Sequence, residues 1–245
     1  FAIKDNEIFL LEANPRASRT APFVSKAIGI QLAKLGALVM SGKKIKDLNL
    51  PNESNSNAYF SVKEAVFPFS KFPEVDVLLG PEMKSTGEVM GFGKTFGEAY
   101  FKAQRAAGVI LPKEGNVFIS VRDHDKEQIC EVASELIVMG FKVYATSGTF
   151  NYLADAGIVC SKINKVKDGH PHIVDMIKNN EVHLIINTTE GARSIKDSFS
   201  IRKEAQNHKI SLTTTVSGAK AFCKAIKFID DFGAQDLKQR HESTS

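Results

Sequence analysis

The sequence predicts an α/β protein whose second part is built on a parallel sheet covered by helices on both faces. From about residue 113 onward, five short apolar segments alternate with five segments of helical pattern. Strands and helices that alternate at this spacing form parallel sheets with buried strands. A stretch that contains Gly and Pro, at about residues 108–115, separates this region from a first part in which strand and helix patterns do not alternate regularly. Two domains are therefore expected, at residues 1–112 and 113–245.

The first part is predicted to hold a hairpin, a helix, and a strand followed by a second helix. "FAIKDNEIFLLEA" contains two strand patterns joined by a turn at Lys4-Asp5-Asn6-Glu7. Apolar residues at helical spacing then predict one helix, which Gly42 is placed to end. A polar loop at 49–57 leads to a strand over 58–72, interrupted at Pro68, and to a helix over about 95–107. The residues at helical spacing are Val24, Ile28, Leu32, Leu35 and Val39.

The second part alternates regularly between strand and helix patterns. Ligands of such sheets bind beyond the carboxyl ends of the strands, so the residues that follow each strand are candidates for a site. The predicted strands are 116–121, 141–146, 158–163, 182–189 and 209–215. The predicted helices are 125–140, 150–157, 171–180, 192–208 and 218–229.

Composition restricts the class of protein. A hydrophobic content of 43% and a charged content of 24% are typical of a soluble globular protein. The net charge of +4 is too small to indicate nucleic acid, although it suits small anions. No apolar run approaches the ~18 residues of a membrane span. The three cysteines, Cys130, Cys160 and Cys223, form no C-x-x-C pair, which indicates the reduced thiols of a cytoplasmic protein and no zinc framework. Because the chain lacks an initial Met and starts inside the hairpin, a longer protein is expected.

The stretch "STGEVMGFGKTFGEAY" contains Gly-Lys-Thr but does not fit a phosphate-binding P-loop. That motif requires G-x-x-x-x-G-K-[ST], because the loop must have one length to curl around phosphates. Counting back from Gly93, Glu88 stands where the first glycine belongs, and Gly87 is one residue too far away. The stretch is therefore predicted to be a turn that leads into the helix beginning near Thr95.

"LLEANPRASRT" is the first candidate site. On an extended segment Glu12 and Asn14 point to the same face, and their oxygens suit a hard cation such as Mg²⁺. Arg16 and Arg19 follow, and guanidinium groups suit phosphate or carboxylate oxygens. A metal with two arginines is the set of groups that neutralises a transferring phosphoryl group. The alternative is a strand end with a solvated, charged turn.

Polar residues that follow three predicted strands form the second candidate site. Hydroxyls, amides and an ammonium group that converge at one sheet edge, beside a helix amino terminus, favour a phosphate. The alternative is that these residues are ordinary caps and turns. They are Thr146, Ser147, Gly148 and Thr149 after the second strand, Lys165 after the third, and Asn187, Thr188 and Thr189 after the fourth.

Two long segments closely resemble one family. "EANPRASRTAPFVSKAIGIQLAKLGALVMSGKKI" and "SVKEAVFPFSKFPEVDVLLGPEMKSTGEVMGFGKTF" resemble the end of the second ATP-grasp unit of carbamoyl phosphate synthetase large subunits. The pairing of "ExNPRxSRT" with "LGPEMxSTGEVMG" is highly specific, and the likeness covers essentially the whole chain. It implies that residues 1–112 complete the carbamate-phosphorylating unit. Residues 113–245 would form a Rossmann-like, methylglyoxal-synthase-like allosteric domain.

The resemblance implies an activity, its cofactors and its partners. The full-length protein would use ATP with Mg²⁺ or Mn²⁺ to make carbamoyl phosphate from bicarbonate and ammonia, for pyrimidine and arginine biosynthesis. Ammonia would come from glutamine through a small amidotransferase subunit, and the full-length protein would be an oligomer. Glu12 and Asn14 would be metal ligands, with Arg16 and Arg19 at the phosphate and carbamate. This chain alone is expected to be inactive.

The resemblance also assigns effector sites. In bacterial relatives, positions of the allosteric domain bind UMP and IMP, and a site between the two domains binds ornithine. Glu64 and Thr214 match two ornithine-site positions, whereas Leu212 stands where a tyrosine is expected, which leaves ornithine control open. The matching nucleotide-site positions are Ser120, Lys126, Thr146, Thr149, Lys165, Asn187 and Thr189.

Other readings receive less support from the residues. A stand-alone nucleotide-binding regulatory module would leave "ExNPR" without a role. Independent lyase activity is disfavoured, because Asp168 lies outside any "GGDQQ"-type loop. His170 and His172 have no apparent third metal ligand and are predicted to serve packing or turns. Asp123-His124-Asp125 is predicted to be a solvated turn in which Asp125 caps a helix.

Overall fold

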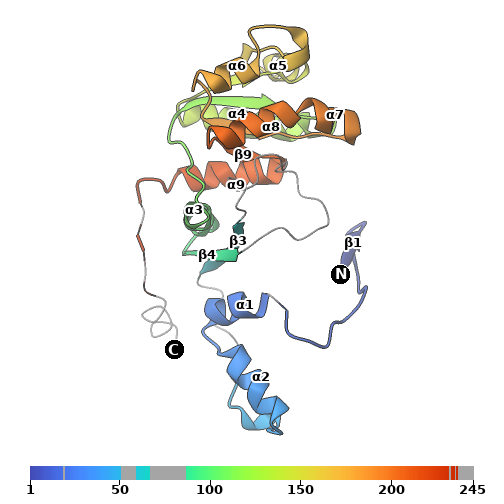
Figure 1. Cartoon of the computed structure of the whole chain (residues 1–245), viewed down its shortest axis with the longest axis vertical. Helices are drawn as coiled ribbons and strands as arrows, with labels where there is room; N and C mark the ends of the chain where they lie inside the picture. Colours follow the sequence, from blue (N-terminus) through green and yellow to red (C-terminus); the bar gives the residue numbers. More distant parts are fainter. Residues whose placement is uncertain (19, 51–58, 67–86, 232, 235, 237–245) are drawn as a thin grey trace. The chain divides into compact units, whose positions relative to one another are not determined.

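The computed structural model describes residues 1–18, 20–50, 59–66, 87–231, 233–234 and 236, side chains excepted at 192, 193 and 197. The chain divides into two compact units (Figure 1). One unit comprises Phe1–Ala58 with Ala234–Ser245, and the other comprises Tyr59–Gly233. The predicted boundary at 112/113 falls inside the second unit, and the assignment of residues 1–112 to one domain stays a prediction.

The first unit begins with the predicted hairpin. Strands β1 (Ala2–Lys4) and β2 (Glu7–Phe9) pair antiparallel. Asp5 and Asn6 between them have positive φ angles of 50° and 63°. Asp and Asn tolerate this conformation better than other residues, and two such residues in a two-residue loop match the twist of the strands. The hairpin prediction is confirmed.

The single helix predicted over the region of Val24 to Val39 is wrong, because two helices occupy it. Helices α1 (Thr20–Ile28) and α2 (Leu32–Met40) meet at an angle of 114°. Gly29 lies between them with φ 74°, and the Ser25 hydroxyl donates to the Ile30 carbonyl at the break. Gly42, with φ 102°, follows the end of α2 as predicted. No single described helix is long and apolar enough to cross a membrane; this bent pair meets the criterion by length and composition only.

The second unit starts with an antiparallel pair and a helix packed on it. Strands β3 (Phe60–Val66) and β4 (Gly87–Gly93) pair along their whole length. Helix α3 (Phe96–Ala106) follows with Thr95 as its N-cap, which accepts a hydrogen bond from the Glu98 backbone N–H at 3.2 Å. The Glu98 carboxylate accepts from the Lys94 backbone N–H, one residue before the cap, and the predicted helix start near Thr95 is confirmed.

The glycines of "GFGKTFG" allow close packing. A Cβ atom on Gly91 would overlap the Ala99 carbonyl oxygen and the Ala103 nitrogen of α3. On Gly97 it would lie 2.6 Å from the Lys224 carbonyl oxygen. These glycines therefore let α3 approach β4 on one side and a later helix on the other. The prediction that the stretch leads into a helix is confirmed.

The rest of the second unit is a five-stranded parallel sheet, as predicted. The spatial order is β7-β6-β5-β8-β9. The chain runs from β5 outward through β6 to β7 and then returns to β8, so the direction of winding reverses between β5 and β8. Ligands of doubly wound sheets bind at this reversal point. The strands are β5 (Gly115–Ser120), β6 (Phe141–Ala145), β7 (Ser161–Lys162), β8 (Leu184–Asn187) and β9 (Ser211–Thr213).

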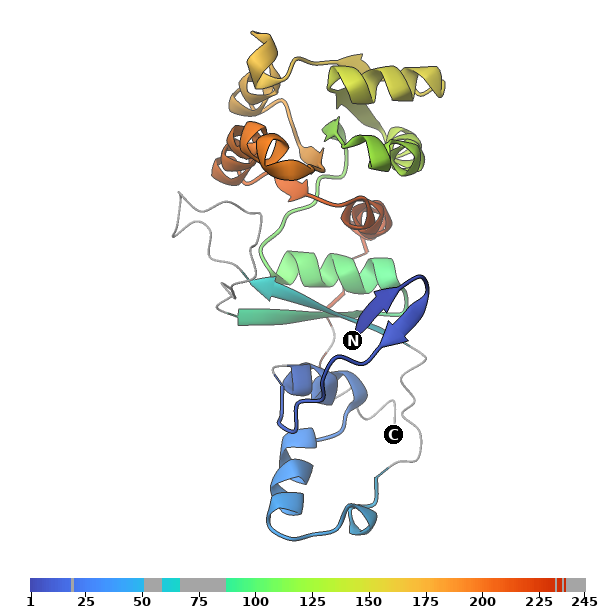
Figure 2. The same cartoon turned by 90° about the vertical axis from the view of Figure 1, so that its right-hand side faces the viewer.

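Helices cover both faces of this sheet (Figure 2). One core cluster joins alternate residues of β5, such as Val117 and Ile119, to α4, α5 and α9. The other joins Phe118 of β5 and Ile185 of β8 to α6 and α8. Residues that alternate along a strand point to opposite faces, which gives the sheet its two cores. The helices are α4 (Lys126–Val138), α5 (Ser147–Asp155), α6 (Ile173–Lys178), α7 (Gly191–Asp197), α8 (Phe199–Asn207) and α9 (Val216–Ile226).

One detail differs from prediction in this region, and one contact joins it to the preceding layer. The helix predicted over 192–208 is two helices, α7 and α8, separated at Ser198, whose ψ angle of −1° departs from helical geometry. Helix α3 packs on α9, where the rings of Tyr100 and Phe222 are 6.2 Å apart. The β3–β4–α3 layer and the parallel sheet therefore belong to one compact unit.

Candidate functional site

A cavity of about 530 Å³ opens at the carboxyl edge of the parallel sheet, where β5 and β8 end side by side. We call it the sheet-edge cavity. Its position is the reversal point of the fold, and its volume lies within the usual range for small-molecule sites. Its lining includes Ser120 and Arg122 at the end of β5, Thr146 after β6, Lys165 after β7, and Asn187 and Thr188 at the end of β8.

Hydroxyl groups tie the strand ends together at this cavity. The Thr146 hydroxyl donates to the Ser120 hydroxyl oxygen at 3.1 Å, which links β6 to β5. The Arg122 backbone N–H donates to the Thr188 hydroxyl oxygen at 3.1 Å, which links β5 to β8. The Val121 backbone N–H donates to the hydroxyl oxygen of Thr149 in α5 at 3.2 Å. These bonds hold the rim of the cavity in one arrangement.

Asn187 is the buried polar side chain of the cavity. Only 1% of its surface is exposed, and its Nδ2 donates to the Ser120 carbonyl at a long 3.4 Å. Its Oδ1 is buried without a hydrogen-bond partner among the described residues. A buried acceptor without a partner costs about 1–3 kcal/mol, and a water molecule, an ion or a ligand can remove this cost by supplying the partner. Asn187 Oδ1 is therefore a hydrogen-bond acceptor at the cavity that no described residue uses.

Charged groups of both signs lie at and near the same cavity, whose lining includes Lys165 and Lys167 together with Asp123 and Glu190. Arg122 Nε pairs with Asp125 Oδ2 at 2.8 Å, and Lys126 Nζ pairs with Asp123 Oδ1 at 2.7 Å. The hydrogen bond and charge of Lys126 lower the pKa of Asp123. A Cβ built on Gly148 would lie 3.5 Å from Lys126 Nζ, so this ammonium group stands at the amino terminus of α5. A helix amino terminus beside a cation favours an anion.

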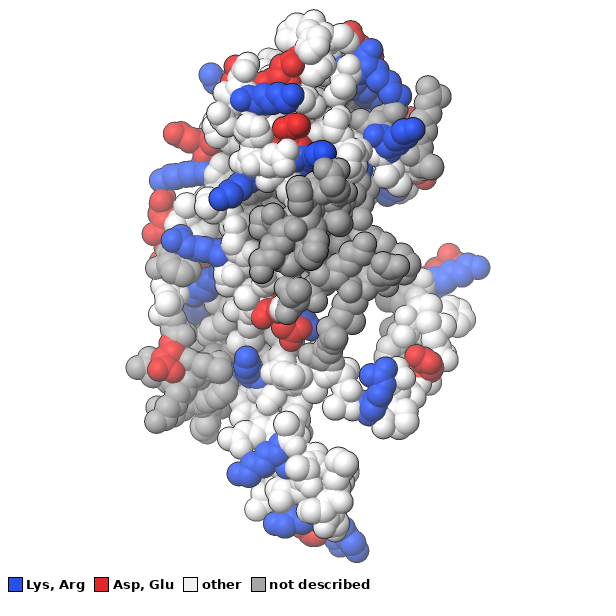
Figure 3. Space-filling model, viewed as in Figure 1, with Lys and Arg blue, Asp and Glu red and all other residues white. Residues whose placement is uncertain are grey.

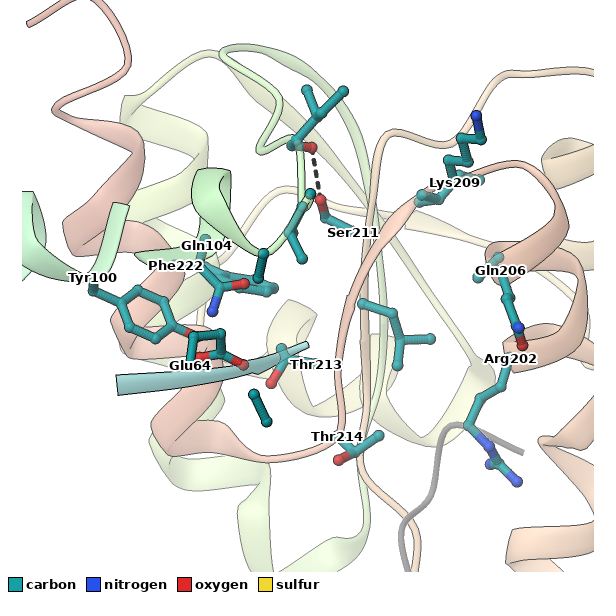
Figure 4. A pocket seen from close by; sticks show the side chains of 18 residues that line it. Glu64, Tyr100, Gln104, Arg202, Gln206, Lys209, Ser211, Thr213, Thr214 and Phe222 are labelled. Atoms are coloured by element: carbon teal, nitrogen blue, oxygen red, sulfur yellow. Dashed lines mark hydrogen bonds between the residues drawn. The ribbon is translucent and has the colours of Figure 1, made fainter. Parts of the chain in front are cut away.

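A second cavity, of about 520 Å³, lies between α3, β3 and the α8–β9 region (Figure 4). We call it the α3 cavity. Glu64, Tyr100 and Gln104 gather on one side of it, with Arg202, Gln206 and Lys209 on the other. The Ser211 hydroxyl closes one end by donating to the Ile110 carbonyl at 2.7 Å. Burial and the charge of Glu64 raise the pKa of Tyr100 to about 12, so its hydroxyl stays protonated at neutral pH.

Glu64 gives the α3 cavity a dependence on pH. Burial raises the pKa of Glu64, and a hydrogen bond with Gln104 opposes this only in part. Because the folded-state pKa lies above the unfolded value, Glu64 costs the fold stability once pH rises above about 4.5, and none below it. The Glu64→Gln variant should therefore have a higher Tm than the parent at pH 7.5, and the difference should shrink toward pH 4.

Calorimetric scans of both proteins between pH 4 and 8 test this. Glu114→Gln is the control, because Glu114 is exposed. The raised pKa of Glu64 would be contradicted by either of two results. One is a Tm of Glu64→Gln below the parent value at pH 7.5, and the other is a Tm difference that stays constant with pH.

The first unit holds the other predicted residues. Glu12 and Asn14 are exposed in an irregular segment after β2, and Asn14 Nδ2 donates to Glu12 Oε1 at 3.2 Å. The two side chains therefore share one face, although the segment is not a strand. Arg16 is exposed nearby, and Arg19 lies outside the described residues.

Comparison with known proteins identifies the family. Residues 128–214 match the family model described as "MGS-like domain". The carbamoyl phosphate synthase large chain of Pseudomonas putida is 55% identical over 240 residues, which cover 98% of this chain and 22% of that protein. The chain belongs to the carbamoyl phosphate synthase large-chain family. The match to the relative from Xanthomonas axonopodis pv. citri covers 99% of this chain and 23% of that protein at 49% identity.

The chain spans about a fifth of the length of the carbamoyl phosphate synthase large chains that it matches, for example 22% of the Pseudomonas protein. The matched portion is their carboxyl-terminal part. The recognition made from the sequence motifs, and the predicted α/β class with a methylglyoxal-synthase-like domain, are confirmed. A solved structure titled "Crystal structure of ForH" has a TM-score of only 0.34 and 17% identity, which is too weak to inform the fold.

In this carbamoyl phosphate synthase segment, the sheet-edge cavity gathers most of the predicted nucleotide-site residues. Five of them line it: Ser120, Thr146, Lys165, Asn187 and Thr188. Three do not: Lys126 at the α5 terminus, Thr149 buried behind the rim, and Thr189. Glu64 and Thr214, predicted for ornithine, both line the α3 cavity together with Leu212. The binding roles of all these residues stay predictions.

Sequence reasoning missed some lining residues and misjudged others. Arg122 and Lys167 line the sheet-edge cavity. Arg122 follows closely on β5, which was a usable signal, whereas Lys167 lies further from β7, in the short 3-10 turn Val166–Asp168. Asp125 stands at the N-cap position of α4 but makes no capping hydrogen bond, because its carboxylate pairs with Arg122. Sequence reasoning found no third potential metal ligand beside His170 and His172, and that part of the prediction is wrong, because Asp175 lies beside them. The predicted turn role is confirmed for His172, which is the N-cap of α6.

Proposed function

We propose that the sheet-edge cavity is the allosteric site of this carbamoyl phosphate synthase segment and that it binds a nucleoside monophosphate, UMP or IMP. The observation that carries the proposal is the unpartnered, buried Asn187 Oδ1 in a cavity whose charged lining, among the described residues, is three cations, Arg122, Lys165 and Lys167, and two carboxylates, Asp123 and Glu190. Lys165, Arg122 and the amino terminus of α5 suit a phosphate. Asn187 Oδ1 suits a ribose hydroxyl or a base N–H, which an inorganic anion lacks.

Calorimetric titration of the chain with UMP and with IMP tests this proposal. Lys165→Ala should weaken binding about tenfold, because the lost ammonium contact is solvent-exposed. Lys178→Ala is the matched control, an exposed lysine at the end of α6 that does not line the cavity. Absence of saturable binding of either nucleotide by the folded chain, or equal affinities of the two variants, would refute the proposal.

We further propose that the full-length protein makes carbamoyl phosphate from bicarbonate, ATP and ammonia delivered by a small glutamine amidotransferase subunit. The names of the relatives and the adjacent Glu12 and Asn14 side chains support this. A carboxylate and an amide oxygen are donors that Mg²⁺ or Mn²⁺ accepts, with ATP phosphates completing its coordination. Arg16 and Arg19 would neutralise charge on the transferred phosphoryl group. Pyrimidine and arginine biosynthesis, cytoplasmic location and an oligomeric assembly belong to the same proposal.

The α3 cavity is the proposed ornithine site. Glu64 offers a carboxylate for an ammonium group, and Thr214 offers a hydroxyl. Leu212 occupies the position where the family pattern has a tyrosine, so one polar contact of that site is absent. A stand-alone regulatory module is the alternative to the synthetase. In that case the chain would bind a nucleotide, and the whole protein that contains it would not make carbamoyl phosphate.

A further inference from the structure

His170, His172 and Asp175 converge at the start of α6, outside both cavities. His170 Nδ1 lies 2.7 Å from Asp175 Oδ2, and His172 Nδ1 lies 3.1 Å from the same oxygen. The two imidazole rings are tilted by 34° with their centroids 4.3 Å apart. One ligand atom from each residue falls within 4.8 Å of the others. The three side chains therefore present nitrogen and oxygen atoms to one point.

The capping of α6 leaves lone pairs crowded at this point. The Asp175 backbone N–H donates to the His172 carbonyl at 3.0 Å and, as a longer second branch of 3.4 Å, to His172 Nδ1, which is an acceptor in this arrangement. Asp175 Oδ2, also an acceptor, lies 3.1 Å from it and accepts from the His172 backbone N–H at 2.9 Å. Two acceptor atoms at this separation repel each other unless a proton or a metal cation lies between them. A capping role explains His172 and Asp175 but does not explain why His170 joins them.

We propose that His170, His172 and Asp175 bind a divalent transition-metal ion of the Zn²⁺ class. Imidazole nitrogens with one carboxylate are the donor set that zinc favours, and Mg²⁺ or Ca²⁺ would require more oxygens. Tetrahedral zinc with bonds of about 2.1 Å holds its ligand atoms about 3.4 Å apart. The observed separations of 2.7 and 3.1 Å from Asp175 Oδ2 would lengthen by about 0.7 and 0.3 Å to reach this spacing, a change that side-chain rotation can supply. The His170 side chain is 77% exposed, so water can complete the coordination.

The metal would close a loop that carries a cavity residue. His172 forms a parallel bridge with Asn164, and the Ile173 backbone N–H donates to the Asn164 carbonyl. Asn164 Nδ2 also donates to the Gly169 carbonyl at 3.2 Å. Residues 164–172 thus form a closed loop that has Lys165 near its beginning and His170 near its end. A metal that fixes His170 against Asp175 restrains this loop, and with it the approach of Lys165 to the sheet-edge cavity.

Titration with Zn²⁺ alone, by calorimetry and by competition with a chromophoric chelator at pH 7.5, tests the site. The parent chain should bind one equivalent, and Co²⁺ in its place should give the intense visible absorption of tetrahedral coordination. His170→Ala should weaken Zn²⁺ affinity at least about tenfold, since loss of a ligand costs no less than loss of a supporting contact. His124→Ala is the matched control, because His124 is exposed and outside the cluster. Its affinity should equal that of the parent.

His172→Asn separates metal binding from helix capping, because asparagine keeps a capping acceptor and loses the imidazole. This variant should retain the parent Tm without metal and lose the Zn²⁺ site. In the parent, Zn²⁺ should also slow amide hydrogen exchange across residues 164–172. Absence of saturable Zn²⁺ binding by the parent, or binding unchanged in both His170→Ala and His172→Asn, would overturn the proposal. None of these outcomes depends on whether the chain binds a nucleotide.

Discussion

Replacing Gly91 by alanine should lower the stability of the Tyr59–Gly233 unit by about 3 kcal/mol, at the upper end of overpacking costs. The new methyl group would overlap the Ala99 carbonyl oxygen and the Ala103 nitrogen, both of which are backbone atoms of α3. Backbone atoms of a helix cannot rotate away as a side chain can, so α3 must shift off β4. The loss corresponds to a decrease of roughly 10 °C in Tm for a unit of this size.

Thermal unfolding of Gly91→Ala beside Gly87→Ala measures this effect. Gly87 lies on the same strand, and a Cβ there would meet nothing within 4 Å. The control should melt within about 2 °C of the parent, as exposed substitutions usually do. If the two variants melt together, the close approach of α3 to β4 is not part of the folded structure. A shift of α3 in Gly91→Ala should also disrupt the α3 cavity, because α3 carries the lining residues Tyr100 and Gln104.

Replacing Asn187 by leucine should weaken nucleotide binding without lowering the stability of the folded chain. The substitution removes the unpartnered Oδ1, whose burial costs about 1–3 kcal/mol, and gives up only one long hydrogen bond of 3.4 Å to Ser120. The Tm should therefore stay unchanged or rise. Nucleotide affinity should fall about 100-fold, because an apolar group of similar volume replaces a buried acceptor against a polar ligand.

Thermal scans and UMP titration of Asn187→Leu beside Asn151→Leu test both halves of this expectation. Asn151 is exposed on α5 and does not line the cavity, so its variant should bind UMP as the parent does. A Tm decrease of more than a few degrees in Asn187→Leu would show that the amide is structural. An unchanged affinity would exclude Asn187 from the binding site.

The order of strands and helices in the second unit could be predicted because each segment carries its own periodicity and turn residues. The break between α1 and α2 could not. Ile28 and Leu32 are four residues apart, so the helical spacing continues across Gly29 even though the chain bends by 114° there. Periodicity records which residues share a face of a helix, and a bend that preserves the spacing leaves it unchanged.

The candidate sites were predictable where backbone topology alone brings residues together. Thr146, Lys165 and Asn187 follow parallel strands, and parallel strands end at the same edge, so their meeting required no knowledge of side chains. The pairing of Arg122 with Asp125 and the approach of Asp175 to His170 depend on local turns and rotamers. One signal was nevertheless available, since His172 and Asp175 have the spacing of a capping box.

The packing of α3 on α9 limits how the chain can be shortened. A protein that starts at the parallel sheet would lack α3 and would leave Phe222 and the backbone at Lys224 without the surface that now covers them. Newly exposed aromatic and apolar groups promote self-association. A shortened protein that starts at Tyr59 keeps that surface covered and retains every lining residue of both cavities. The smallest piece suited to expression and crystallisation therefore begins well before the first strand of the sheet.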